Sequence, residues 1–183
     1  RQDSVSVKDD EQPGKAKVDR IPTLRPAFKS DGTITAANAS SISDGASALV
    51  LTRESNLNGR APLARIVAHT THSIHPSEFT LAPIGAIEKL LEKTGWSADS
   101  VDLFEINEAF AMVTMLTMQA LNLPHEKVNI YGGACAQGHP IGSTGSRLIV
   151  TLAHALQQHD KQRGIAALCI GGGEATAVAL ERA

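Results

Sequence analysis

The sequence predicts an α/β fold in which strands alternate with helices. Three observations lead to this prediction: short apolar runs typical of buried strands, helical spacing of apolar residues between them, and glycine or proline at their ends. Counted from Leu63, the order is βαβαβαββ, which predicts a mixed, mainly parallel sheet covered on both faces, with a final hairpin adding an antiparallel strand. In such sheets ligands bind beyond the carboxyl ends of strands, so the residues that follow strands are the candidates for function.

The individual elements follow from the same patterns. The predicted strands span 63–71, 101–107, 128–131, 164–170 and 174–181. The predicted helices lie between them, at about 83–94, 108–121 and 142–159. Pro83 stands in the first turn of the first helix and Gly95 follows its last residue, which is the usual placement of these two residue types.

Two segments lie outside this pattern. The run ASALVLT at 46–52 has the composition of a buried strand, but it has no partner strand, so we expect its sheet to lie mostly outside this chain. Residues 1–20 carry five basic and five acidic side chains with few large apolar ones, which indicates a solvated loop or arm. The chain starts at Arg1 in a polar stretch, so we expect it to be part of a longer protein.

Composition limits the classes of function. The chain has 183 residues, of which 42% are apolar and 20% charged, which suits a globular enzyme or a piece of one and excludes a disordered chain. A net charge of −2 provides no field to attract nucleic acid or an anionic membrane. Apolar runs are too short to span a bilayer, and no amino-terminal segment resembles a signal peptide. Cys135 and Cys169 form no CxxC pattern, which argues for free thiols in a reducing compartment and against a structural zinc site.

Three predicted strand ends carry reactive or polar side chains beside a tight backbone. They are Asn107 to Phe110, Gly132 to Pro140 with His139, and Cys169 to Gly173. Glycines let backbone N–H groups approach a ligand closely, and the following helix start favours anionic charge. A phosphate loop is the competing interpretation of GHPIGSTG, but the Lys of GxxxxGK[ST] and the GxGxxG spacing are both absent. An oxyanion site therefore fits better.

Each candidate also has a plainer interpretation. A lone histidine is usually a structural hydrogen-bonding residue, and a free cysteine is usually a small core residue. Three glycines after Cys169 would instead expose its thiol at a strand end, where it can exchange protons as acid and base. We expect Glu108 to be structural, because a carboxylate is favoured near a helix start. Met112, Met115 and Met118 have the spacing of core residues.

A metal site is a further alternative. His69, His72 and His75 lie close together in sequence, but in an extended segment residues 69 and 72 point to opposite faces. Metal ligands must converge, so these histidines do not predict a metal centre.

At this point the motifs resemble a known family. NEAFA at 107–111, NIYGGACAQGHPIGSTGSR at 129–147 and CIGGGEATAVALER at 169–182 look like the carboxyl-terminal signatures of the thiolases, and ITAANASSISDGASALVL at 34–51 resembles their substrate-loop segment. The resemblance implies a thiolase-like fold. It also implies acyltransfer between CoA thioesters: Claisen condensation of two acetyl-CoA to acetoacetyl-CoA and CoA, and the reverse thiolysis of 3-ketoacyl-CoA.

The resemblance also implies roles for single residues. Cys169 would be the acid/base thiol, His139 would activate the nucleophilic cysteine and donate to the thioester oxyanion, and Asn107 would hold a water of that oxyanion hole. The N–H of Gly171 would contribute to a second hole. Ser40, with Ala37 and Ala39, would line the pantetheine tunnel, and Phe79 would lie near the acyl pocket. Some such enzymes bind K⁺ through carbonyls of a similar loop, here Ala36, Ala37 and Ala39; no other metal and no further cofactor is expected.

One departure from the family is an absence. A thiolase needs a nucleophilic cysteine in its amino-terminal half, and Cys135 does not occupy an equivalent motif. The resemblance therefore predicts a carboxyl-terminal half with three parts: 1–42, the remainder of a substrate-binding loop domain; 43–62, a strand completing the absent amino-terminal domain and a linker; and 63–183, the carboxyl-terminal domain.

The expected partners are acetyl-CoA, acetoacetyl-CoA, CoA and the missing amino-terminal half, in a cytoplasmic homo-oligomer. The alternative is a non-catalytic acyl-CoA-binding or lipid-binding protein, or a structural subunit with the same fold. Asn107, His139 and Cys169 together argue against that alternative, because a carrier needs none of the three.

Overall fold

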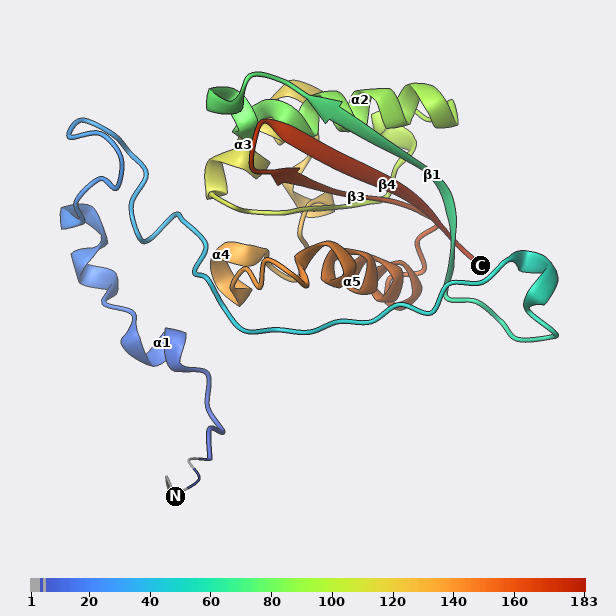
Figure 1. Cartoon of the computed structure of the whole chain (residues 1–183), viewed down its shortest axis with the longest axis horizontal. Helices are drawn as coiled ribbons and strands as arrows, with labels where there is room; N and C mark the ends of the chain where they lie inside the picture. The colour runs from blue at the N-terminus through green and yellow to red at the C-terminus, as the bar shows by residue number, and fades with distance from the viewer. Residues whose placement is uncertain (1–3, 5) are drawn as a thin grey trace. The chain divides into compact units, whose positions relative to one another are not determined.

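The computed structural model describes residue 4 and residues 6–183, which divide into two compact units, Arg1–Ala37 and Asn38–Ala183 (Figure 1). The first unit contains a short helix, α1 (Glu11–Lys15), and a 3-10 helix, η1 (Val18–Thr23), and neither element buries a side chain. Asp10 caps α1 by accepting a hydrogen bond from the N–H of Gln12. The exposed side chains agree with the predicted solvated arm.

The second unit contains one four-stranded mixed sheet in the order β1-β4-β3-β2. The strands are β1 (Ala64–Ser73), β2 (Leu103–Ile106), β3 (Arg163–Ile170) and β4 (Glu174–Arg182). β4 pairs antiparallel with both β1 and β3, and β2 pairs parallel with β3. β1, β2 and β3 therefore run in the same direction and β4 runs against them, so the α/β class and the closing β3–β4 hairpin are confirmed. Only one neighbouring pair is parallel, because β4 lies between β1 and β3.

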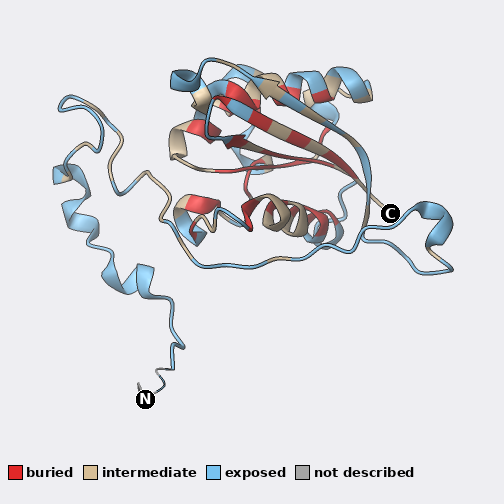
Figure 2. Ribbon diagram, viewed as in Figure 1, coloured by how far each residue is buried: buried red, intermediate tan, exposed pale blue. Residues whose placement is uncertain are grey.

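Helices cover both faces of this sheet (Figure 1). α2 (Ala82–Thr94) and α3 (Ala111–Leu121) lie on one face, where α2 contributes Ala86, Ile87 and Leu90 to a buried cluster with Phe104 and Ile165. α5 (Thr144–Gln158) lies on the other face and packs its leucines against Leu103 and Ala166. Figure 2 shows the buried residues gathered between these layers. The remaining short elements are η2 (Glu54–Asn56), η3 (Pro76–Leu81), η4 (Ala98–Ser100), η5 (His125–Lys127) and α4 (Ala134–Gln137).

The helix boundaries follow from the residues at their ends. Pro83 occupies the first turn of α2, and Gly95 ends that helix in the left-handed conformation at φ 70°. α3 ends at Asn122, which also adopts the left-handed conformation. These positions confirm the three predicted helices to within a few residues.

One predicted strand is wrong, and a second stays untested because its expected partner strands are not among the described residues. Residues 128–131 form only an isolated parallel bridge between Val128 and Phe104, because the chain turns at Asn129, which has a positive φ of 48°. The run at 46–52 is not a strand within the described residues, and it is not buried: Val50 is 98% exposed and Leu51 is 70% exposed. The methionines of α3 also differ from expectation, since Met118 packs against the core but Met115 is 66% exposed.

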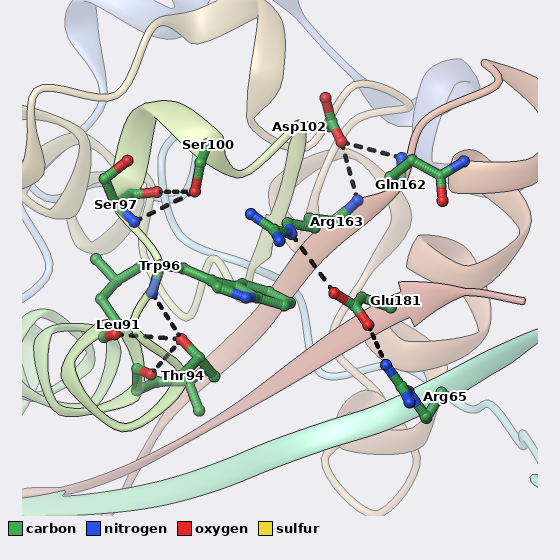
Figure 3. A network of polar contacts seen from close by, with 11 residues as sticks. Arg65, Leu91, Thr94, Trp96, Ser97, Ser100, Asp102, Gln162, Arg163 and Glu181 are labelled. Atoms are coloured by element: carbon green, nitrogen blue, oxygen red, sulfur yellow. Dashed lines mark hydrogen bonds and ion pairs between the residues drawn. The ribbon is translucent and has the colours of Figure 1, made fainter.

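A network of polar contacts joins β1, β4 and β3 at the end of the sheet away from Cys169 (Figure 3). Glu181 of β4 accepts from Arg65 of β1 at 2.5 Å and lies 3.5 Å from the Nε of Arg163 in β3. Arg163 also lies over the ring of Trp96, 4.8 Å from its centroid. Exposed ion pairs of this kind contribute roughly 0–1 kcal/mol each, so the apolar layers provide most of the stability. Within the described residues, no helix is long and apolar enough to cross a membrane.

The turn between β3 and β4 depends on Gly173, which gives a first prediction. Its φ is +90°, and an added Cβ would lie 2.2 Å from the backbone oxygen of Ile74. Gly173→Ala should destabilise the chain by about 2–4 kcal/mol, since left-handed backbone alone costs roughly 1–2 kcal/mol. Urea unfolding followed by circular dichroism would measure this. Gly142→Ala is the matched control, because no atom lies within 4 Å of its added Cβ. Equal stability of the two variants would contradict the argument.

Candidate active site

The parallel pairing of β2 and β3 brings two predicted site residues to the same edge of the sheet. Ile106 is paired with Ala167, and the N–H of Asn107 donates to the oxygen of Ala167 at 2.9 Å. Cys169 lies two residues beyond Ala167, near the end of β3. Asn107 is fully buried and Cys169 is 8% exposed. Both side chains therefore stand at neighbouring carboxyl ends of strands, as the sequence predicts.

His139 contacts Asn107 directly. Its Nε2 lies 3.4 Å from the Nδ2 of Asn107, and its Nδ1 lies 2.7 Å from the Oγ1 of Thr144. The hydroxyl of Thr144 donates to the oxygen of Pro140 at 3.0 Å, so it can only accept from His139. His139 therefore carries its proton on Nδ1 and has the lone pair of Nε2 directed towards Asn107. The Oδ1 of Asn107 is buried and has no hydrogen-bond partner in the described part of the chain.

The electrostatic setting favours neutral side chains. Burial, and secondarily the positive charge of Arg147, lower the pKa of His139, so the imidazole is neutral at pH 7. Burial raises the pKa of Cys169, and a backbone hydrogen bond offsets part of that effect. At rest the site holds an unprotonated imidazole nitrogen and an un-ionised thiol.

An extended segment, Asn38–Ile42, connects the two loops that carry Asn107 and His139. Ala39 forms an antiparallel bridge with Phe110, and both the N–H and the hydroxyl of Ser40 donate to the oxygen of Ala109. Ile42 then forms a parallel bridge with His139. Gly138 permits this approach, because at its φ of +89° an added Cβ would lie 2.2 Å from the Oγ of Ser43.

The remaining predicted residues are placed as follows. The ring of Phe79, in η3, meets that of Phe110 edge-on with centroids 6.3 Å apart, so Phe79, Ala39 and Ser40 all adjoin the loop that follows Asn107. Gly171 is exposed in the turn after β3. Ala36 and Ala37 belong to the first unit and Ala39 to the second, so the K⁺ site remains a prediction.

Sequence reasoning missed Thr144, which orients His139. The signal was present in the sequence, because a threonine five residues after the histidine, at the start of a helix, can reach back to the imidazole. Nothing in the pattern distinguished it from Ser143 or Ser146.

Glu108 has the structural role that was expected, although through different contacts. One of its oxygens accepts from the Nδ2 of Asn129 at 2.8 Å, and the other accepts from the N–H of Cys135 at 2.9 Å, at the start of α4. Burial and the charge of Glu108 raise the pKa of Cys135 to about 11, which keeps this thiol protonated and poorly nucleophilic. Among the described residues, no three His, Cys, Asp or Glu side chains converge as metal ligands.

Comparisons with known proteins agree with these motifs. Residues 60–182 match the family model of the thiolase C-terminal domain, and residues 1–55 match that of the thiolase N-terminal domain. The fold and site thus define a thiolase-type α/β protein. The chain belongs to the thiolase family.

Individual relatives and structures are similar over almost the whole chain. An acetyl-CoA acetyltransferase of Schizosaccharomyces pombe is 47% identical over 178 residues, which is 96% of this chain and 45% of that protein. A cytosolic acetyl-CoA acetyltransferase of mouse is 46% identical over 187 residues, covering 100% of this chain and 47% of that protein. The crystal structure of the Bacillus anthracis acetyl-CoA acetyltransferase has a TM-score of 0.89 at 42% identity, covering 92% of this chain and 43% of that one.

A structure with a bound ligand is also similar. Human mitochondrial 3-ketoacyl-CoA thiolase in complex with CoA has a TM-score of 0.83 at 37% identity, covering 92% of this chain and 43% of that one. The chain therefore spans less than half the length of the relatives it matches.

The two thiols provide a second prediction. Since the pKa of both is raised, alkylation by iodoacetamide should be slow at pH 7 and should accelerate about tenfold for each pH unit up to the pKa, which for Cys135 is about 11. Peptide mass spectrometry after timed alkylation would give a rate for each cysteine, with the chain unfolded in guanidinium as the control. Rapid alkylation of Cys135 at pH 7 in the folded chain would contradict its assignment as a non-nucleophile.

Proposed function

We propose that this chain supplies the acid/base half of a thiolase-type acyltransferase. The reaction is the condensation of two acetyl-CoA to acetoacetyl-CoA and CoA, and the reverse thiolysis of 3-ketoacyl-CoA. The observation that carries the proposal is the group formed by Asn107 and His139, 3.4 Å apart, with Cys169 at the end of the adjacent strand. The nucleophilic cysteine would come from an amino-terminal half of the same enzyme.

The first step is acylation of that cysteine. The lone pair of His139 Nε2, which faces the Nδ2 of Asn107 at rest, takes the thiol proton of the nucleophile, whose sulfur attacks the carbonyl carbon of the first acetyl-CoA. The C–S bond to CoA then breaks, and CoA leaves as a thiol after receiving the proton of Cys169, which becomes a thiolate, while His139 keeps the proton of the nucleophile on Nε2. Thr144 supports this role, because its hydroxyl accepts from Nδ1 and so keeps Nε2 unprotonated.

The second step forms the carbon–carbon bond. The thiolate of Cys169 removes a proton from the methyl group of the second acetyl-CoA, and the resulting enolate carbon attacks the acyl group on the nucleophilic cysteine. The bond to that cysteine breaks, its sulfur recovers its proton from Nε2 of His139, and acetoacetyl-CoA is released. In thiolysis, Cys169 returns the proton to the departing carbon. A raised thiol pKa suits both directions, because the thiol is protonated at rest and its thiolate is a strong base.

Negative charge develops on thioester oxygens in both steps and requires hydrogen-bond donors. The N–H of protonated Nε2 of His139 would donate to the enolate oxygen. A water that itself donates a hydrogen bond to the buried, unpartnered Oδ1 of Asn107 would be the second donor. The backbone N–H of Gly171 would contribute to a second oxyanion hole for the acyl-enzyme. The exposure of Gly171 supports this role, since its N–H lies in a turn that substrate can approach.

Substrate contacts are assigned to the residues around the Asn38–Ile42 segment. Ser40, Ala37 and Ala39 would line the pantetheine tunnel, and Phe79 would border the acyl pocket. The edge-on contact of Phe79 with Phe110, three residues beyond Asn107, supports a pocket for short acyl groups. Carbonyls of Ala36, Ala37 and Ala39 would be the ligands of K⁺ if the full enzyme uses it.

Exposed apolar side chains support a missing partner. Ile42, Val50 and Leu51 are 87%, 98% and 70% exposed, and Met115 on α3 is 66% exposed. Exposed large apolar side chains are the kind of surface that a partner would cover. We propose that residues 43–62 complete the sheet of the amino-terminal half and that the whole enzyme is a cytoplasmic homo-oligomer.

The role of Cys169 gives a third prediction. In the complete enzyme, Cys169→Ala should lower the rate of acetyl-CoA condensation by at least ~100-fold, since general acid–base catalysis contributes about that much or more. Acyl-enzyme formation on the nucleophilic cysteine, followed by intact-mass spectrometry, should partly survive. Cys135→Ala is the matched control and should retain condensation. Unchanged condensation in Cys169→Ala would rule out the assigned role.

A fourth prediction concerns the partner. Native mass spectrometry of the purified material should show this 19.3 kDa chain bound to a second polypeptide of comparable size that carries a reactive cysteine. That complex should cleave acetoacetyl-CoA in a thiolysis assay. Acyl-CoA binding by the isolated chain without any thiolysis by the complex would instead favour the non-catalytic carrier.

A further inference from the structure

A buried charged pair lies beneath the candidate site and takes no part in the chemistry above. Oε2 of Glu105 lies 3.7 Å from Nη1 of Arg147, with side-chain exposures of 2% and 17%. Neither this oxygen nor the two terminal nitrogens of Arg147 have a hydrogen-bond partner within the described residues. Burying two charges costs several kcal/mol per ion unless they interact closely. A pair of well-packed leucines would therefore give the fold more stability at these two positions.

The pair connects the two elements that carry the site. Glu105 belongs to β2 and precedes Asn107 by two residues. Arg147 belongs to α5 and follows Thr144, the residue that orients His139, by three residues. The same layer contains apolar contacts between β2 and α5, through Leu103 and Leu148, but these have no directional preference.

We propose that Glu105 and Arg147 are positioning residues of the candidate site. Their attraction fixes β2 relative to α5, and thereby the way in which the imidazole of His139 faces Asn107. The charge of Glu105 also balances the charge of Arg147 at His139. This inference deepens the proposed function, on which it rests for the view that His139 acts in catalysis.

The charges around the pair support this second role. Burial raises the pKa of Glu105 to about 7, Arg147 lowers it, and the carboxylate of Glu108 raises it further. Arg147 in turn is the charged residue that lowers the pKa of His139. The charges facing the site are therefore Arg147 from α5, Glu105 from β2 and Glu108 from the loop after β2. Glu105 therefore changes its charge near neutral pH.

The direction of the coupling follows from the signs. When Glu105 is ionised, its negative charge offsets Arg147, and the pKa of His139 rises towards its ordinary value. When Glu105 is neutral, Arg147 acts alone, and the pKa of His139 falls. Arg147→Met should therefore raise the pKa of His139. Glu105→Gln should lower it only slightly, because Glu105 is already mostly protonated in the lower pH range where His139 titrates.

The test is a nuclear magnetic resonance titration of the imidazole ¹⁵N and ¹H signals in this chain, with His139 identified by its loss in His139→Gln. We expect Arg147→Met to raise the pKa of His139 by about 0.5 unit or more, which is the size expected from one unit charge in a partly buried site. Glu105→Gln should shift this pKa little, but it should remove the inflection of the His139 signals near pH 7 at which Glu105 changes its charge. Arg147→Lys, which retains the charge, should rescue the pKa in part.

Matched controls are Glu92→Gln and Arg53→Gln, which remove one exposed charge each. The ¹⁵N shifts also report the tautomer, and loss of the fixed Nδ1–H form in Glu105→Gln would support the positioning role. If the variants fold and neither the tautomer nor the pKa of His139 changes, the inference is wrong.

A measurement on the unaltered chain covers the case in which the variants do not fold. The ¹³C signal of the Glu105 carboxyl should titrate near pH 7, and the His139 signals should show a second inflection at that pH. Absence of that inflection would overturn the inference. None of these measurements needs thiolase activity. If the His139 signals respond to Glu105 and Arg147 but the complete enzyme is inactive, only the proposed function is refuted. If the complete enzyme is active but the His139 signals do not respond, only this inference is refuted.

Discussion

The parallel register between β2 and β3 is the constraint on which the site depends. β2 has only four residues, and all four are buried, because one side packs on α2 and α3 and the other packs on α5. A slip by one residue would move Glu105 away from Arg147 and into the apolar cluster that contains Phe104 and Ile106, so the register is strongly specified. The pairing of Ile106 with Ala167 therefore fixes where both strands end, and with it the relative positions of Asn107 and Cys169.

The second constraint is the backbone of the Asn38–Ile42 segment, which crosses two loops without being part of the sheet. Its bonds to Ala109 and Ala111 secure the loop after Asn107, and the oxygen of Ser41 accepts from the N–H of His139 at 2.8 Å. Hydrogen bonds of this kind place a loop accurately only where the chains approach closely. Gly138 has no side chain to prevent that approach.

The sequence predicted the features that follow from local patterns, such as the ends of helices and strands. It did not predict the features that depend on contacts between distant segments. The glycine and proline signals at Pro83, Gly95 and Gly173 fixed ends of elements, and the motifs identified Asn107, His139 and Cys169. The prediction of a strand at 46–52 stays untested, because the sheet that these apolar residues are expected to join is not among the described residues. The contact between Glu105 and Arg147 joins residues 42 positions apart, and no spacing rule connects a strand to a later helix across a layer.

Burial determines the protonation states of the candidate site, because it disfavours the charged form of every titratable group. Removing water lowers the pKa of the imidazole of His139 and raises that of the Cys169 thiol, and both changes favour the neutral form. In the proposed reaction, a site that is neutral at rest would meet little electrostatic resistance when an uncharged thioester enters. Charge would then develop only as the proton moves, where the proposed oxyanion holes would stabilise it. The same low dielectric makes the distant charge of Arg147 effective at His139, and so gives a reason for a carboxylate to be buried beside it.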